Sequence, residues 1–349
     1  MGKAWVVFEK KGFFTTFATD NTNKTHSAMI TNTGLNELKD IMAYLDKTPY
    51  CVTRKQLYNA AELYEGFNLN DEDSYCNCFD GKVYQYYNYT GNQEASVYEK
   101  LARNLHDHGI HAALTEFFEE HDPHRCVGIM GGHTLLRTDK MFRDIARLSK
   151  RLTEEGFVML SGGGPGAMEA THLGAWMAGR TASELNDALK MLMHAPSFKD
   201  ADWLCSAFRV IKKYPQDHFE SLGIPTWLYG HEPSTPFATH IAKFFENSVR
   251  EDNILTLAYG GLIYTPGSAG TMQEIFQEAV QNHYLSFGFA SPMIFLGKQF
   301  WTEELPVYPL LEQLMSSGKY KNLLLTITDD LDEIVTVIKD FHKSSTTKQ

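Results

Sequence analysis

The feature that most limits the possible folds is an alternation of short apolar runs with helix-like segments, which begins at Cys126 and continues almost to the end of the chain. This alternation is typical of βα units and a parallel sheet. The runs expected to form strands are CVGIM, FVMLS, TWLYG, GLIYT, PMIFL and LLLTI, and helices are expected at about 138–154, 166–178, 236–257, 270–284, 305–316 and 329–342. In an open sheet of this kind, ligands bind beyond the carboxyl ends of the strands.

The sequence therefore predicts an α/β fold with a doubly wound, Rossmann-like, mostly parallel sheet over residues 126–345. Within it, the stretch 181–223 is longer than a usual connection and has its own helical pattern, so we expect a helical insertion. We expect residues 1–92 to form a small α+β N-terminal domain and residues 93–125 to form connecting helices. In the N-terminal domain, residues 4–19 and the run SYCNCFDGKVYQYYNY each resemble two strands around a turn, the second at Asp80-Gly81. Between them, the run TRKQLYNAAELYEG at 53–66 is expected to be helical.

Composition excludes several classes of partner. The chain of 349 residues carries 32 basic and 43 acidic residues, a net charge of −11, with no dense basic block. Binding to a nucleic acid polymer or an anionic membrane is therefore not expected. Five scattered cysteines and an N-terminus without a signal-peptide layout predict a cytoplasmic protein. No apolar run approaches the roughly 18 residues that a membrane-spanning helix needs.

Three glycine-rich turns follow three of the expected strands. They are Gly131-Gly132-His133, the run from Ser161 to Gly166, and the run from Pro266 to Thr271. Glycine lets the backbone approach a ligand closely, and the free N–H groups at the start of the following helix suit a phosphate. The alternative is that these glycines only permit tight turns and close helix packing. Because three turns meet at one edge of the sheet, we favour an anion site.

Two other motif interpretations compete with this one. Gly162-x-Gly164-x-x-Ala167 matches a dinucleotide fingerprint, but it follows the second strand, and no acidic residue ends a following strand about 20 residues on. Ser268 could be a nucleophile at a strand-to-helix turn, but its glycine spacing differs from G-x-S-x-G.

Three charged residues near the third turn are considered for a role in chemistry. Glu274 follows the glycine turn on a predicted helix, and Glu278 lies four residues later on the same face. Arg250 stands shortly before the GLIYT run and has the planar guanidinium that suits phosphate or carboxylate. The alternatives are favourable helix-dipole placement for Glu274, a solvated helix face for Glu278 and a surface position for Arg250.

The histidine-rich segments HDHGIH and HDPH do not have metal-ligand spacing. His106 and His108 would lie on roughly opposite faces of a helix, without cysteine or carboxylate partners at suitable spacing. We therefore expect no metal site there and interpret these histidines as solvated or capping residues.

With these residues assembled, the region from about 126 to 340 resembles the LONELY GUY phosphoribohydrolases, often described as lysine decarboxylase-like, and the related nucleotide 5′-monophosphate nucleosidases. The GGGPGxM signature is found at Gly162–Met168, and the PGGxGTxxE signature at Pro266–Glu274. Arg250 matches the arginine that the family has before the PGG strand. Ser268 departs from the pattern because it replaces the second glycine of PGG, and the residues around Arg250 lack the usual Arg-Lys pair.

The resemblance implies hydrolysis of the N-glycosidic bond of a nucleoside 5′-monophosphate, without a metal or redox cofactor. Glu274 and Arg250 would be the catalytic residues, the former stabilising the oxocarbenium-like charge and the latter holding the phosphate or the departing base. The residues that would bind the phosphate are Gly267, Ser268, Ala269, Gly270 and Thr271, and those that would bind the rest of the nucleotide are Gly131, Gly132, Gly163, Gly164, Gly166 and Met168.

The resemblance also implies a homodimer or larger homo-oligomer. Residues 1–92 and the insertion at 181–223 are foreign to the short LONELY GUY enzymes, whereas larger nucleosidase relatives carry extra flanking domains. A second hypothesis is a non-catalytic sensor of a nucleotide-derived ligand on the same fold. The presence of both Arg250 and Glu274 favours the enzyme, whereas Ser268 and the added regions favour the sensor.

Overall fold

The computed structural model describes residues 7–9, 12–14 and 32–346. By its internal contacts the chain divides into two compact units, Met1–Thr48 and Pro49–Gln349. In the first unit, strands β1 (Val7–Glu9) and β2 (Gly12–Phe14) pair antiparallel, as predicted for residues 4–19. Positions 10 and 11, between the strands, lie outside the described residues. Helix α1 (Asn32–Leu45), which the sequence pattern did not predict, completes the description of this unit.

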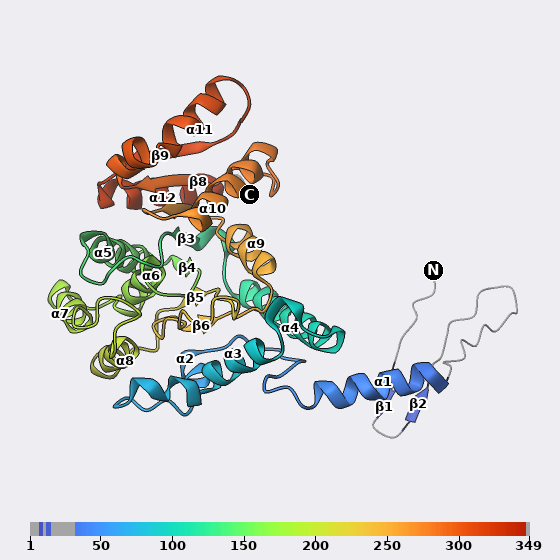
Figure 1. Ribbon diagram of the computed structural model, residues 1–349. Helices are drawn as coiled ribbons and strands as arrows, with labels where there is room; N and C mark the ends of the chain where they lie inside the picture. The colour runs from blue at the N-terminus through green and yellow to red at the C-terminus, as the bar shows by residue number, and fades with distance from the viewer. Residues whose placement is uncertain (1–6, 10–11, 15–31, 347–349) are drawn as a thin grey trace, which may run out of the picture. The chain divides into compact units, whose positions relative to one another are not determined.

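The second unit is built on a seven-stranded sheet in the order β6-β5-β4-β3-β7-β8-β9, and each strand pairing in it is parallel (Figure 1). The chain starts the sheet at β3, adds β4, β5 and β6 on one side, and then returns to add β7, β8 and β9 on the other. This is the doubly wound α/β fold that the sequence predicted. The strands are β3 (Cys126–Met130), β4 (Val158–Ser161), β5 (Ser221–Gly223), β6 (His240–Ile241), β7 (Gly261–Tyr264), β8 (Pro292–Leu296) and β9 (Leu324–Thr328).

Helices cover both faces of the sheet, which is why its central strands are continuous apolar runs. On one face, Val127 and Ile129 of β3 join a core with residues of α5 (Lys140–Glu154), α6 (Ala167–Trp176) and α12 (Leu331–Thr346). Successive residues of a strand point to opposite faces. A Cβ built on Gly128 would lie 3.3 Å from the Cβ of Ala258, which directly follows α9 (Asn247–Leu257). Helix α9 therefore lies on the opposite face.

Two more helices contact α9. Helix α10 (Ala269–Tyr284) packs against it, and α4 (Val97–Glu120) contacts it through the His111 and Asn253 side chains. The remaining helical elements of this unit are α2 (Ala60–Leu63), η1 (Glu72–Asn77), α3 (Phe79–Tyr89), η2 (Asn92–Glu94), η3 (Pro123–Arg125), α7 (Ala182–Leu192), α8 (Trp203–Lys213), η4 (Phe300–Glu304) and α11 (Val307–Ser316). Among the described residues, no helix is both long and apolar enough to cross a bilayer.

The hairpin predicted at Asp80-Gly81 is wrong, because these residues lie in the first turn of α3. The Asp80 carboxylate is fully buried and accepts hydrogen bonds from Lys243 Nζ at 2.7 and 2.9 Å and from Trp227 Nε1 at 2.9 Å. A Cβ built on Gly81 would lie 2.2 Å from the Tyr75 carbonyl oxygen. Gly81 is therefore needed for close packing rather than for a turn. Asp80 is held by its buried ion pair with Lys243 rather than by a hairpin.

The expected strand TWLYG and the beginning of the helix expected at 236–257 are also wrong. The third strand of this region is β5, which ends at Gly223, before Pro225. Proline has no N–H for a sheet ladder, and beyond Pro225 the pairing continues only as an isolated bridge between Thr226 and Phe244. Trp227 is then buried against Phe245, with ring centroids 4.5 Å apart. Residues 236–246 contain β6 and an irregular segment, so the helix begins only at Asn247.

Two helical segments before the sheet also differ from the expectation. Where two connecting helices were expected, α4 runs without a break through Gly109, because this glycine allows close approach rather than a turn. A Cβ there would lie 2.1 Å from the Arg54 carbonyl oxygen. In the run from 53 to 66, only Ala60–Leu63 is α-helical. Residues 49–92 belong to the same compact unit as the sheet.

Candidate active site

A cavity of about 230 Å³ opens at the carboxyl ends of β3 and β7, the two adjacent strands from which the chain winds in opposite directions. This is the position at which doubly wound folds bind ligands. The residues that line it are Gly131, Gly132, His133, Met168, Tyr229, Glu232, Arg250, Glu251, Ser268, Gly270, Thr271 and Glu274.

The structure brings most of the residues predicted for the site to this cavity. Gly131, Gly132, Met168, Arg250, Ser268, Gly270, Thr271 and Glu274 line it. The predicted residues that are not among those lining it are Gly163, Gly164, Gly166, Gly267 and Ala269.

The three glycine turns are joined to one another by backbone hydrogen bonds. The Gly132 N–H donates to the Pro266 carbonyl at 3.1 Å, and the Ala167 N–H donates to the Gly132 carbonyl at 3.1 Å. Gly166 has φ +69°, and a Cβ on it would lie 2.4 Å from the Gly132 oxygen. A Cβ on Gly267 would lie 2.1 Å from Thr271 Oγ1. Gly166 and Gly267 therefore allow the turns to pack closely together next to the cavity.

The first turn of α10 supplies the positive end of a helix dipole to the cavity. Ser268 occupies the N-cap position without a side-chain capping bond, so its hydroxyl does not serve the helix. A Cβ on Gly270 would meet nothing within 4 Å, which leaves open space beside the backbone. The early N–H groups of a helix have no intrahelical partners and favour anions. Ser268 has φ −123°, a conformation that does not require glycine.

Glu274 and Arg250 form the charged centre of the cavity. The distance from Arg250 Nη1 to Glu274 Oε1 is 3.9 Å, and the two side chains are 12% and 13% exposed. Arg250 Nε donates to the Ile224 carbonyl at 3.0 Å, which orients the guanidinium. Burial raises the pKa of Glu274 to about 7, with the Arg250 charge opposing this shift and the Glu251 charge adding to it. Glu274 can therefore take up or release a proton near neutral pH.

The start of α9, and with it the position of Arg250, is fixed by a side chain from α4. Glu246 is the N-cap residue but makes no side-chain capping bond. Instead, the Asp107 carboxylate accepts from the Phe245 N–H at 2.9 and 3.1 Å and from the Glu246 N–H at 2.9 Å. Asp107 thus places the helix whose first turn carries Arg250.

His106 is not the solvated or capping residue that the sequence suggested. Its side chain is fully buried, and its ring nitrogens lie 2.9 Å from Tyr58 Oη and 2.9 Å from Asp107 Oδ1. The histidine therefore supports the aspartate that caps α9. Glu278, for which a solvated face was considered, is also buried and accepts a hydrogen bond from Ser291 Oγ. Burial raises the pKa of Glu278 to about 7.

Four lining residues were not among the residues predicted for the site: His133, Tyr229, Glu232 and Glu251. Residues 226–230 were expected to be a strand, so Tyr229 and its neighbour Glu232 were not considered for the site. The signal that could have found them is Pro225, which ends the strand early and leaves the following residues in a loop at the ligand-binding edge. Glu251 is held by Asn247 Nδ2 at 2.7 Å and Gln273 Nε2 at 2.5 Å.

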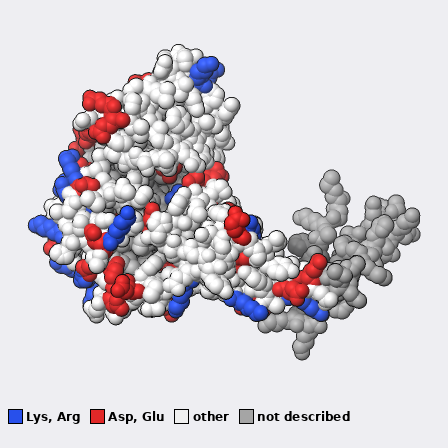
Figure 2. Space-filling model, viewed as in Figure 1, with Lys and Arg blue, Asp and Glu red and all other residues white. Residues whose placement is uncertain are grey.

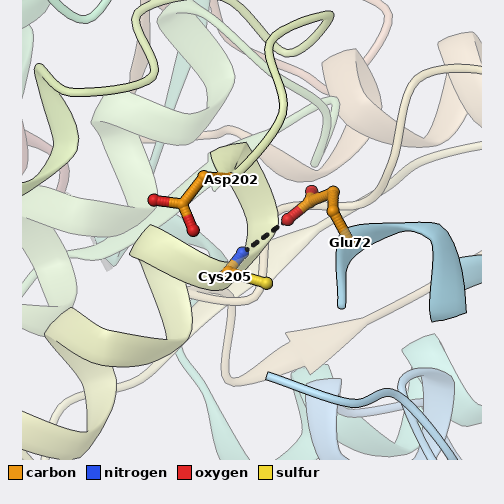
Figure 3. Close-up of side chains that lie close together, drawn as sticks. All are labelled: Glu72, Asp202 and Cys205. Atoms are coloured by element: carbon orange, nitrogen blue, oxygen red, sulfur yellow. Dashed lines mark hydrogen bonds between the residues drawn. The ribbon is translucent and has the colours of Figure 1, made fainter. Parts of the chain in front are cut away.

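One group of potential metal ligands occurs among the described residues, away from this cavity. Glu72, Asp202 and Cys205 place ligand atoms within 4.8 Å of one another (Figure 3). The Glu72 carboxylate accepts from the Leu204 N–H at 2.8 Å and the Cys205 N–H at 3.1 Å, so it caps α8. Asp202 is paired with Arg209. Helix capping and this ion pair explain the cluster.

The charged side chains are mixed in sign across the molecular face shown in Figure 2, where no continuous basic patch is visible on the described residues.

No protein-family model and no curated protein matches the chain. Among solved structures it is similar to the molybdenum cofactor binding protein from the phototrophic bacterium Rippkaea orientalis, at 17% identity over 62% of this chain and 95% of that chain, with a TM-score of 0.40. For a structural-genomics target named TM1055, the identity is 19% over 62% and 98% of the two chains, with a TM-score of 0.40. For the Chlamydomonas rheinhardtii Moco carrier protein, the identity is 16% over 62% of this chain and 96% of that chain, with a TM-score of 0.36. The assignment of the fold rests on the sheet itself.

Proposed function

We propose that this protein hydrolyses the N-glycosidic bond of nucleoside 5′-monophosphates, giving the free base and ribose 5-phosphate. The observation that carries the proposal is a largely buried carboxylate, Glu274, that lies 3.9 Å from Arg250 in a cavity also lined by the first turn of a helix. These are the groups that the reaction needs: a carboxylate for the developing positive charge, a cation and an anion-binding helix terminus.

In this mechanism the phosphate binds at the N–H groups and hydroxyls of the first turn of α10, where Ser268 and Thr271 line the cavity. The bond between C1′ of the ribose and the base nitrogen breaks, and its electron pair leaves with the base. The ionised Glu274 stabilises the oxocarbenium-like centre and orients the attacking water. The water oxygen bonds to C1′, and the base nitrogen gains a proton.

Arg250 supports the same step in two ways. Its guanidinium is close enough to Glu274 to favour the ionised carboxylate, because a neighbouring positive charge lowers a carboxyl pKa. It also provides hydrogen-bond donors for the phosphate or for the departing base.

The test is a panel of nucleoside monophosphates, with released base measured by chromatography. We expect Glu274→Gln to retain nucleotide binding and to lower turnover at least about a hundredfold, in line with the usual contribution of acid–base groups. Glu278→Gln is the matched control because it makes the same change on the same helix, at a buried residue outside the cavity lining. It should keep the turnover of the unchanged protein.

Unchanged turnover in Glu274→Gln would remove this residue from the mechanism. Tight binding of a monophosphate without release of base from the unchanged protein would instead identify a non-catalytic nucleotide-binding protein, the alternative that Ser268 and the added regions suggest.

A further inference from the structure

The cavity contains a carboxylate that the proposed reaction does not use. Glu232 lines the cavity, and its side chain is 14% exposed. Within the described part of the chain, the basic atoms found near it are His133 Nε2 at 3.6 Å and His231 Nε2 at 3.8 Å from Oε1. Both distances exceed that of a good hydrogen bond. A ligand in the cavity with suitably placed N–H groups would pair with this carboxylate at shorter distances than the two histidines do.

Glu232 and Arg250 lie near different parts of the Met168 side chain. A Cβ built on Gly162 would lie 2.6 Å from Met168 Sδ and 2.9 Å from Arg250 Nη2. A Cβ built on Gly164 would lie 2.9 Å from Met168 Cε and 3.8 Å from Glu232 Oε2. The Met168 side chain therefore lies between Arg250 and Glu232.

This arrangement orients a bound nucleotide. A nucleotide with its phosphate at the first turn of α10 and C1′ beside Glu274 would extend its base over the Met168 thioether toward Glu232. Tyr229, which is 42% exposed and lines the same cavity, offers an aromatic face to a planar base. The edge of the base then meets the Glu232 carboxylate.

We propose that Glu232 selects guanine, so that guanosine 5′-monophosphate is preferred over adenosine 5′-monophosphate; this inference rests on the proposed function. Guanine presents two adjacent donors, N1–H and the 2-amino group, which match the two oxygens of an ionised carboxylate. Adenine presents its 6-amino group beside N1, which is an acceptor and repels the second oxygen. A site built to pair with particular donors rejects a base that lacks them, because its buried polar groups are then left unpaired.

The test compares binding and turnover of the two nucleotides. Affinities are measured by calorimetry in the full chain carrying Glu274→Gln, and release of base is measured with Glu274 intact. A good bidentate pair corresponds to about 1–3 kcal/mol, so we expect at least about a fivefold preference for the guanine nucleotide. Glu232→Gln should lose this preference or reverse it, because a carboxamide offers one donor and one acceptor, as adenine does.

Glu251→Gln is the matched control. It removes the same charge from the same cavity, but Glu251 is already held by Asn247 and Gln273. Its ratio of affinities for the two nucleotides should stay as in the parent. Because the readout is a ratio within each variant, a general loss of folded protein does not change it.

Equal affinity of the parent for the two nucleotides would overturn the inference, as would a ratio that Glu232→Gln leaves unchanged. If the ratio changes as expected but no base is released when Glu274 is intact, the nucleosidase proposal fails while the recognition of guanine stands. If neither nucleotide binds, both proposals fall.

Discussion

Glu274 has a pKa set by two opposing influences. Burial disfavours the charged carboxylate, while the guanidinium of Arg250 favours it, and burial dominates because the pKa rises from the ordinary 4.5 to about 7. The proposed mechanism uses the ionised form, so the fraction of active protein depends on pH in the neutral range.

This gives a prediction for the pH dependence of kcat/KM. As pH rises through about 7, Glu274 loses its proton and kcat/KM should increase toward a plateau, with its midpoint near the pKa of the free enzyme. Steady-state assays with a monophosphate from about pH 5.5 to about pH 8.5 would measure this. The residual activity of Glu274→Gln should lack the step near 7, although the substrate phosphate, with a second pKa of about 6, still titrates. A profile in which Glu274→Gln keeps the step would assign it to another group.

At the scale of secondary-structure elements, α9 depends on a cap that comes from another helix. Asp107 of α4 accepts from two backbone N–H groups ahead of α9, and His106 contacts the same carboxylate. Because Arg250 lies in the first turn of α9, the cap that stabilises this helix also sets the position of the guanidinium.

Asp107→Ala should therefore affect both stability and activity. Loss of the carboxylate leaves buried N–H groups unpaired, which we expect to lower the free energy of unfolding by about 1–3 kcal/mol. It should also reduce turnover more than Asp107→Asn, which keeps one acceptor oxygen. Denaturant unfolding and base-release assays measure the two effects. Asp340→Ala is a control on α12, where the side chain is 66% exposed, and its effect should stay within about 0.5 kcal/mol. Normal turnover by fully folded Asp107→Ala would contradict the link to Arg250.

Strands of the sheet could be predicted where the local sequence alone has a clear apolar pattern. CVGIM and PMIFL are uninterrupted apolar runs between turns, and both form strands over their whole length. Strands β5 and β6 have three and two residues, so they carry little periodic signal, and their pairing depends on the neighbouring strands. Asp80 was misinterpreted because the partner that holds it, Lys243, is 163 positions away.

At the scale of the whole molecule, the candidate site also combines residues that local sequence predicts with residues whose positions depend on distant parts of the chain. Arg250 lies near the start of α9, which follows β6, and Glu274 lies near the start of α10, which follows β7. Because the strands are parallel, both helices begin at the edge of the sheet where the carboxyl ends of the strands lie. The loop that contributes Glu232 was predicted as a strand, because its position depends on where β5 ends. The motifs thus predicted that Arg250 and Glu274 would lie in the site, but they did not predict the lining residues Tyr229 and Glu232.

The charge of that cavity has a consequence for kinetics. Three carboxylates line it, from Glu232, Glu251 and Glu274, beside the single guanidinium of Arg250, and the whole chain has a net charge of −11. A nucleotide anion therefore approaches against a repulsive field and is held only after it reaches the helix terminus. Added salt screens charges beyond about 10 Å at 0.1 M ionic strength. We expect the association rate constant, measured by stopped-flow fluorescence with Glu274→Gln, to increase as salt is raised, whereas a steered encounter would slow down. A decrease would mean that the attraction of Arg250 and the helix terminus extends well beyond the mouth of the cavity.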